Sequence, residues 1–288
     1  MAPADPILGL AEAFAKDPRV EKINLSVGVY KDEHGRTPVL ASVKRAEESI
    51  LAVESTKSYK PIDGDAVYNR LVQGLLFGED HEVVQSKRAA TVATPGGTGA
   101  LRVAADFIRK ASPDATVWVS EPTWANHPAV FRAAGLRVAT FPYFDAAANR
   151  LDFDAFFKSL ESIGRGDVLL LHACCHNPTG ADPSIDEWRA IGDAIEARGI
   201  VPLVDFAYQG FAEGLVEDAR GLREIVRPGV EAFVASSFSK NFGLYSERVG
   251  ALTAVGRSPQ ESAVALSHLK TVIRANYSNP PAHGSAIV

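Results

Sequence analysis

Residues 236–250, SSFSKNFGLYSERVG, place one lysine in a small and polar setting. Three serines stand among the four residues before Lys240, and Arg248 supplies a second cation eight positions later. A surface lysine needs no such neighbours, whereas a lysine that bonds covalently to a phosphorylated ligand needs groups that bind phosphate. The spacing Ser237-x-x-Lys240 also occurs in serine acylases, but the Ser-Asp-Asn and Lys-Thr-Gly motifs of that class are missing from the sequence. We therefore expect Lys240, and not Ser237, to be the nucleophile.

The elements that must position this lysine form a regular pattern from about residue 90 onward. Short apolar, β-branched runs alternate with helix-length stretches at 99–111, 125–135, 152–163, 184–199 and 218–227. Strands that are almost entirely apolar are typical of a parallel sheet buried on both faces, and the alternation is typical of a layered α/β domain. The predicted strands are 90–93, 116–120, 136–142, 167–174, 200–206, 231–237 and 250–255.

Polar residues follow several of these strands, where α/β sheets bind their ligands. Gly97 and Thr98 open a predicted helix, whose free N–H groups and dipole favour a phosphate, although they match neither the Walker motif nor GxGxxG. Asn177 follows the fourth strand, Asp205 ends the fifth, and Tyr208 comes three residues later. Taken alone, each residue also fits an ordinary turn or a strand end satisfied by backbone donors.

Pyridoxal 5′-phosphate accounts for these residues together. It needs a lysine for its aldehyde, a carboxylate beside its ring nitrogen, donors for its phenolate oxygen and a phosphate cup. Lys240 and Asp205 fit the first two roles, and Tyr208 with Asn177 fits the third. A nearby cation and the cofactor's phenolate would lower the pKa of the lysine, which then acts as a nucleophile and, once released, as a base. The predicted phosphate cup consists of Gly97, Thr98, Ser237, Ser239 and Arg248.

With these residues in place, the sequence resembles the aspartate aminotransferase branch of the fold type I, class I aminotransferases. The similarity extends over essentially the whole chain. It rests on the segments INLSVGVYKDEHGRTPVL, TKSYKPIDGD, TPGGTGALRVAADF, WVSEPTWANH, CCHNPTGADP, DFAYQGFAEGL, SSFSKNFGLYSERVG and IRANYSNPPAHG.

The resemblance implies a three-layer α/β/α large domain with a mostly parallel sheet, together with an N-terminal arm and an incomplete small domain. Residues 1–40 would form the arm and part of the small domain, and residues 41–288 the large cofactor-binding domain. Family members continue for about a hundred more residues, a domain-sized piece. That piece completes the small domain and supplies an arginine for the substrate α-carboxylate. We therefore expect the sequence to be a fragment of a longer protein.

Further site residues follow from the resemblance alone. Trp124 would stack on the cofactor ring and, with Asn177, contact the substrate. His127 would support Asp205 from behind, and the backbone of Gly28 would lie near the substrate.

The resemblance also implies a homodimer with shared active sites. Tyr59 would cross to the cofactor phosphate of the neighbouring subunit, and Arg274 would cross to pair with the substrate's side-chain carboxylate. The planar guanidinium suits bidentate binding of a carboxylate. Cis peptide bonds are expected before Pro122 and Pro178.

The implied function is reversible amino transfer from L-aspartate to 2-oxoglutarate, giving oxaloacetate and L-glutamate, with Lys240 holding the cofactor as an internal aldimine. An aromatic-amino-acid aminotransferase of the same family is the main alternative. A decarboxylase or lyase that uses the same cofactor is a second alternative, which the dicarboxylate-binding Arg274 disfavours. A truncated, inactive remnant is a third.

Composition limits the remaining classes of function. The net charge of −5 and the pI near 5.8 disfavour binding to nucleic acid or to acidic membranes, and no apolar run is long enough to span a bilayer. The N-terminal residues lack the pattern of a signal peptide, which predicts a cytoplasmic protein. Cys174 and Cys175 are adjacent, so they cannot staple the fold, and with one histidine they make a poor zinc site. No metal site is expected.

Overall fold

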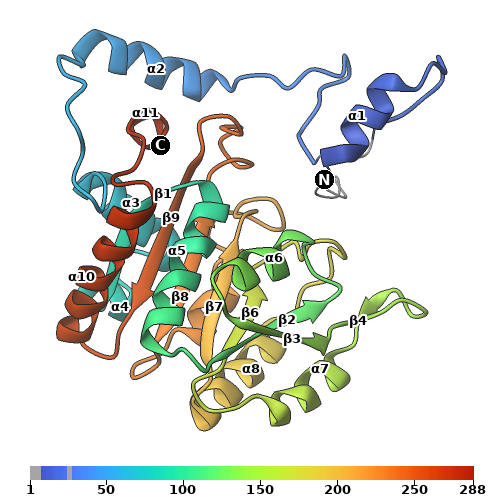
Figure 1. The fold of residues 1–288 in the computed structure, drawn as a ribbon, viewed down its shortest axis with the longest axis vertical. Helices are drawn as coiled ribbons and strands as arrows, with labels where there is room; N and C mark the ends of the chain where they lie inside the picture. Colours follow the sequence, from blue (N-terminus) through green and yellow to red (C-terminus); the bar gives the residue numbers. More distant parts are fainter. Residues whose placement is uncertain (1–7, 25–27) are drawn as a thin grey trace.

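A seven-stranded sheet forms the centre of the protein (Figure 1), seen in a computed structural model that describes residues 8–24 and 28–288. Its strand order is β1-β9-β8-β7-β6-β2-β3. Neighbours from β8 to β3 pair in parallel, whereas β9 is antiparallel to both β8 and β1. The strands are β1 (Ala89–Pro95), β2 (Thr116–Glu121), β3 (Arg137–Pro142), β6 (Val168–His172), β7 (Val201–Phe206), β8 (Ala232–Ser237) and β9 (Val249–Val255).

The seven predicted strands are therefore confirmed, as is the mostly parallel sheet of an α/β fold. A small antiparallel pair, β4 (Phe144–Asp145) with β5 (Arg150–Leu151), was not predicted. Each of its strands has only two residues, which is too short for an alternating pattern to show.

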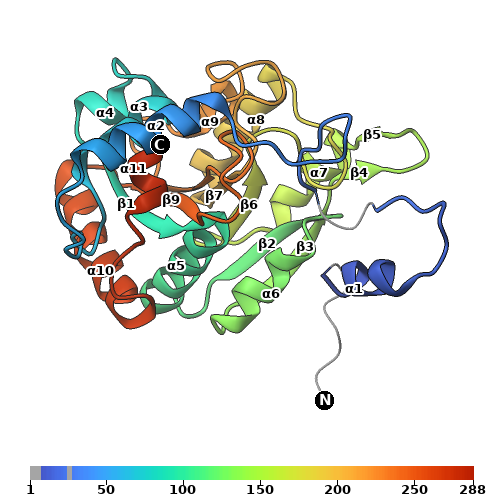
Figure 2. The same ribbon diagram turned by 90° about the horizontal axis from the view of Figure 1, so that it is seen from above.

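Helices cover both faces of the sheet (Figure 2). One face carries α5 (Gly96–Ala111), α6 (Asn126–Ala133) and α10 (Pro259–Asn276), whose buried side chains share a hydrophobic cluster with the strands. A second cluster holds the other face, and its helical members come mainly from α3 (Ala66–Phe77), α7 (Phe153–Ser159), α8 (Ile185–Arg198) and α9 (Arg220–Ile225). The short helices α4 (Glu82–Gln85) and η1 (Leu160–Ser162) complete the connections.

Strand β6 shows why a strand in the middle of this sheet is apolar at successive positions. Val168 and Leu170 belong to the cluster beneath α5 and α10, whereas Leu169 and Leu171 belong to the cluster on the opposite face. All four are at most 3% exposed. Each such side chain contributes about 1.5–3 kcal/mol of hydrophobic stabilisation.

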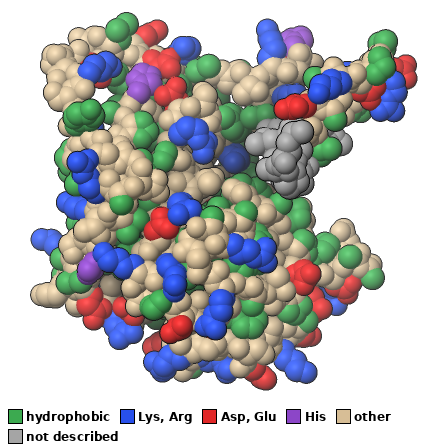
Figure 3. All heavy atoms as spheres, viewed as in Figure 1, with side chains coloured by type: hydrophobic (Ala, Val, Ile, Leu, Met, Phe, Trp, Pro, Cys, Tyr) green, Lys and Arg blue, Asp and Glu red, His purple; other side chains and the backbone are tan. Residues whose placement is uncertain are grey.

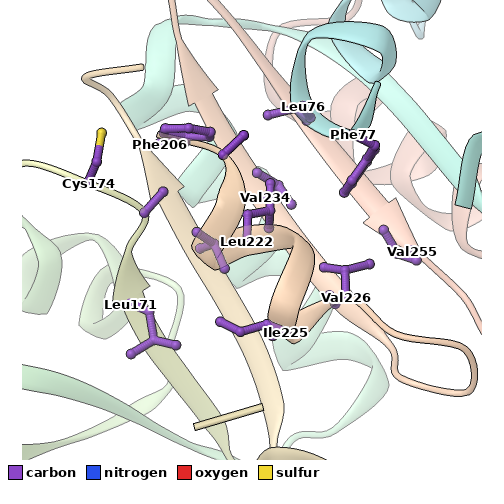
Figure 4. Packing of buried hydrophobic residues seen from close by; sticks show 14 of the residues in the cluster. Leu76, Phe77, Leu171, Cys174, Phe206, Leu222, Ile225, Val226, Val234 and Val255 are labelled. Carbon is purple, nitrogen blue, oxygen red and sulfur yellow. The ribbon is translucent and has the colours of Figure 1, made fainter. Parts of the chain in front are cut away.

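The second cluster is drawn in Figure 4. Leu222, Ile225 and Val226, from α9 and its end, pack above Val234 of β8, and Phe77 of α3 approaches from the side. These residues bury the face of the sheet opposite α5, so the strand ends that carry polar residues are fixed at one edge.

The N-terminal part lies outside these layers. Helices α1 (Leu8–Lys16) and α2 (Ala41–Val53) run above the sheet, and α2 contacts the last helix, α11 (His283–Ile287) (Figure 1). Leu51 is 83% exposed and Val53 79%. Residues 1–7 and 25–27 of the predicted arm lie outside the described residues, and a domain boundary at residue 40 stays a prediction.

Among the residues that the structure describes, no helix is both long and apolar enough to cross a membrane.

Candidate active site

Sheet pairing gathers the predicted polar residues at one edge. His172 at the end of β6 pairs with Asp205 of β7, and Asp205 pairs with Ala235 of β8. Ser237, the last residue of β8, pairs with Gly250 at the start of β9. Because β9 is antiparallel, its first residues lie at the same edge as the last residues of its neighbours. Residues 205, 237, 240 and 248 are thereby brought to one edge of the sheet.

His127 of α6 supports Asp205 directly. Its Nε2 lies 2.9 Å from Asp205 Oδ2, and the side chains are 0% and 11% exposed. Burial acts to raise the pKa of the Asp205 carboxyl, but the hydrogen bond from His127 and the electrostatic interactions with His127, His172 and Lys240 outweigh it. The pKa therefore lies below its usual value, and Asp205 is a carboxylate at neutral pH.

Two residues that sequence reasoning did not single out extend this contact. Thr123 Oγ1 lies 2.8 Å from His127 Nδ1 and 3.5 Å from His172 Nε2. The backbone N–H of Asn177 donates to His172 Nδ1 at 3.1 Å. Burial lowers the pKa of His172 to about 4, so its ring is neutral at pH 7 and carries its proton on Nε2. A continuous polar chain thus runs from Asn177 to Asp205.

Lys240 lies beside Tyr208. Its Nζ is 5.5 Å from the centre of the Tyr208 ring, and both residues are half-buried. Burial lowers the pKa of the Lys240 amine and Arg248 lowers it further, while Asp205 opposes both. Sequence reasoning attributed the lowered pKa to a cation and to the cofactor; in the protein itself, burial is the larger cause. Burial also raises the pKa of Tyr208, with Asp205 adding to the effect.

The start of α5 forms a cradle. Gly96 has φ of +74°, and a Cβ on it would collide with the guanidinium of Arg248. A Cβ on Gly97 would lie 3.0 Å from Ser237 Cβ. Arg248 Nη1 donates to Ser239 Oγ at 3.4 Å. Free backbone N–H groups, hydroxyls and a guanidinium therefore converge, which is a donor set for a phosphate.

Trp124 and Asn177 flank this cluster. The Trp124 ring meets His127 edge-on, with centroids 5.2 Å apart. The side-chain amide of Asn177 has no hydrogen-bond partner within the described ranges. The bonds Glu121–Pro122 and Asn177–Pro178 are both cis, as the resemblance predicts.

Three other predicted residues stay apart from the cluster within one chain. Tyr59 is 92% exposed, Arg274 is exposed and donates to Ser278 Oγ, and Gly28 is exposed with open space at its Cβ position. Figure 3 shows this face of the molecule hollowed beneath the α1–α2 segment, with a Lys or Arg side chain recessed in the hollow.

The loop after Tyr208 is fixed by Asp218, which sequence reasoning also missed. Its carboxylate accepts four backbone N–H bonds, from Gly210, Ala212, Glu213 and Gly214. Asp218 follows a stretch with no regular pattern, so only the three-dimensional structure reveals its role.

Comparisons with known proteins agree with this geometry. The profile of the family described as Aminotransferase class I and II matches residues 20–288. The chain is 56% identical to the aspartate aminotransferase of Salmonella typhi, over 100% of this chain and 72% of that protein. It is 49% identical to the aromatic-amino-acid aminotransferase of Pseudomonas aeruginosa, over 99% of this chain and 71% of that protein.

Among solved structures, the aromatic-amino-acid aminotransferase of Burkholderia pseudomallei, covalently bound to pyridoxal phosphate, superposes with a TM-score of 0.96 at 47% identity. The superposition covers 100% of this chain and 72% of that one. The chain therefore belongs to the aminotransferase class I and II family, a family of transferases, and its cofactor is pyridoxal phosphate.

Proposed function

We propose that the protein transfers the amino group of L-aspartate to 2-oxoglutarate, giving oxaloacetate and L-glutamate. The observation that carries this proposal is the convergence of a shielded amine, an ionised carboxylate and a phosphate cradle at one sheet edge. The identity to aspartate aminotransferases, 49–56% across the chain, supports the choice of substrate.

The residues present fit pyridoxal phosphate. We assign the phosphate to Gly97, Thr98, Ser237, Ser239 and Arg248, because the N-terminus of α5 lies against both Ser237 and the Arg248 guanidinium, which also donates to Ser239. Tyr59 of a second copy would complete this cup.

Asp205 would pair with the protonated ring nitrogen, and its lowered pKa keeps it ionised for that task. Tyr208 and Asn177 would donate to the phenolate oxygen, and Trp124 would cover the ring.

The cofactor supplies an aldehyde that condenses with amines and a ring that withdraws electrons from the substrate Cα. Lys240 supplies the amine, and its lowered pKa leaves a larger fraction unprotonated and nucleophilic. The same Nζ, when unprotonated, would also serve as the base that removes the substrate Cα proton.

Substrate binding would use groups from two copies of the chain. Gly28, Trp124 and Asn177 would contact the substrate from one subunit, and Arg274 of the second would bind its side-chain carboxylate. The high exposure of Tyr59 and Arg274 in a single chain supports a homodimer with shared sites. Two free cysteines, one buried and one half-buried, support a cytoplasmic location.

An aromatic substrate is the second candidate, favoured by the 49% identity to the Pseudomonas aromatic-amino-acid aminotransferase. The test compares kcat/KM for aspartate and phenylalanine, each with 2-oxoglutarate as acceptor and pyridoxal phosphate in excess. We expect aspartate to be the better substrate. A preference for phenylalanine would assign the protein to the aromatic branch. If neither amino acid is turned over, both candidate functions are contradicted.

A further inference from the structure

Asn241, the neighbour of Lys240, has no part in the chemistry described above. Its Nδ2 donates to the backbone oxygen of Gln209 at 3.3 Å. Gln209 in turn follows Tyr208 directly. One side-chain hydrogen bond therefore joins the loop that carries the amine to the loop that carries the phenol.

The accepting side of this bond is itself immobilised. Gln209 is 3% exposed, and its Nε2 donates to two backbone oxygens, of Leu75 at 3.0 Å and of Leu215 at 2.9 Å. Leu75 belongs to α3, so the Tyr208 loop is anchored to a helix packed on the sheet. Asn241 thus connects the Lys240 loop to a fixed point.

The bond from Asn241 to Gln209 leaves the other polar atom of the Asn241 side chain buried without a partner. Asn241 Oδ1 is shielded from solvent and has no hydrogen-bond partner in the described part of the chain. A buried polar atom without a partner is unfavourable. The amide is therefore retained at a position where only its donor is satisfied, and that donor serves the bond to Gln209.

We propose that Asn241 is a positioning residue that holds the Lys240 amine beside Tyr208. The charged and titratable groups facing the amine are Asp205 from β7, Tyr208 from the loop after it, and Arg248 from the end of the Lys240 loop. Holding Nζ among these groups keeps it shielded from water. The inference rests on the proposed role of Lys240 as the cofactor-binding amine.

Removal of the bond has a direct consequence for the amine. In Asn241→Ala the Lys240 loop loses its tie to Gln209, and Nζ gains access to solvent. Because burial is the largest cause of its lowered pKa, the pKa should then rise toward its ordinary value. Asn241→Asp, which has almost the same shape, should act in the same direction, because it removes the donor and adds a negative charge.

Reductive methylation of the unliganded chain measures this pKa without catalysis. The protein is treated with formaldehyde and cyanoborohydride across a pH series, and the modification of Lys240 is followed by peptide mass mapping. We expect the midpoint to lie at higher pH in both variants, and the rate at neutral pH to fall severalfold.

Asn69→Ala is the matched control. Asn69 donates from Nδ2 to Asp63 O at 2.9 Å, and its Oδ1 is also shielded and has no partner among the described residues. It lies on α3, and none of the predicted site residues belongs to this helix. Its removal should lower stability and leave the Lys240 profile unchanged.

The outcomes separate the two proposals. A Lys240 pKa at its ordinary value in the unsubstituted chain contradicts the proposed function. A lowered Lys240 pKa that changes in neither Asn241 variant, or changes equally in Asn69→Ala, overturns only the positioning role. If Asn241→Ala fails to fold, Asn241→Asp decides.

Discussion

His127 Nε2 and Asp205 Oδ2 lie 2.9 Å apart, although 78 positions of sequence separate the two residues. The contact links α6 to β7 across the sheet edge, and neither side chain has room to turn, because His127 is fully buried and Asp205 is 11% exposed. On its other nitrogen the imidazole meets Thr123. The imidazole therefore presents Nε2–H to the carboxylate, which stays ionised and fixed in orientation.

The first prediction concerns this carboxylate. Asp205→Asn keeps the shape but removes the charge that should hold a proton on the cofactor ring. We expect kcat for aspartate to fall by about 10²- to 10⁴-fold, the range of a positioned acid–base group. Cofactor binding should persist through the phosphate cradle. Steady-state assays with equilibrium dialysis of pyridoxal phosphate check both. Asp186→Asn, on the exposed face of α8, is the control, and a loss below tenfold at position 205 would refute the role.

A second prediction follows from two neutral histidines. Burial lowers the pKa of His172 to about 4 and that of His176 to about 3, whereas both titrate near 6.5 in an unfolded chain. Between these values the unfolded state binds more protons than the folded state. Stability should therefore fall as pH drops below about 6.5, by ~1.4 kcal/mol per pH unit for each histidine.

Urea unfolding at pH 6.5, 5.5 and 4.5 measures this slope. His176→Phe keeps a ring stacked on Tyr143, where the native centroids are 3.9 Å apart, but it cannot titrate. It should remove about half of the slope due to the pair. His268→Gln, which removes an exposed imidazole on α10, is the control for the loss of any one histidine. Equal slopes in all three proteins would show that these buried rings do not set the pH dependence.

The order of the strands explains how much of the site was predictable. Asn177, Asp205 and Lys240 follow apolar strands, and the rule that ligands bind at carboxyl ends was enough to place them together. Gly97 and Thr98, which follow the first predicted strand, obey the same rule. The pattern of apolar strands in the sequence is therefore enough to locate the site residues that lie at or just after a strand end.

Other residues reach the site by contacts that periodicity does not describe. Thr123 and Gln209 act through hydrogen bonds whose partners include residues 49 and 134 positions away in sequence. His172 ends β6, so the strand-end rule also applies to it, although the sequence analysis does not single it out. Long-range pairing of polar side chains depends on the packed structure, and no local pattern encodes it.

The third prediction tests the cradle. Gly96→Ala places a methyl group against Arg248, and the flexible guanidinium is the part that moves. The loss should therefore fall on phosphate binding, with a pyridoxal phosphate affinity about tenfold to hundredfold lower, as expected for strain of about 1–3 kcal/mol. Gly166→Ala is the control, because Gly166 has a similar φ of +80° but open space around its Cβ position. Equal affinities in the two variants would argue against the cradle.

The fourth prediction separates a shared active site from a self-contained one. Arg274 is exposed in one chain and, within residues 8–24 and 28–288, its side chain donates only to Ser278, so Arg274→Ala should cost little stability. If a second copy carries this guanidinium into the site, kcat/KM for aspartate should fall by about 30-fold or more, as for the loss of a 2–5 kcal/mol buried charge contact. Turnover of phenylalanine should change far less.

Mixing the Arg274→Ala chain with a Lys240→Ala chain then gives the decisive measurement. Each variant alone lacks one component in both sites, whereas a mixed dimer has one site with an intact Lys240 and an intact Arg274 from opposite subunits. Unfolding and refolding the two together should restore aspartate turnover to about one quarter of the unsubstituted rate, because half of the dimers are mixed and each has one competent site. Recovery of no activity from the mixture would mean that Arg274 serves the site of its own chain.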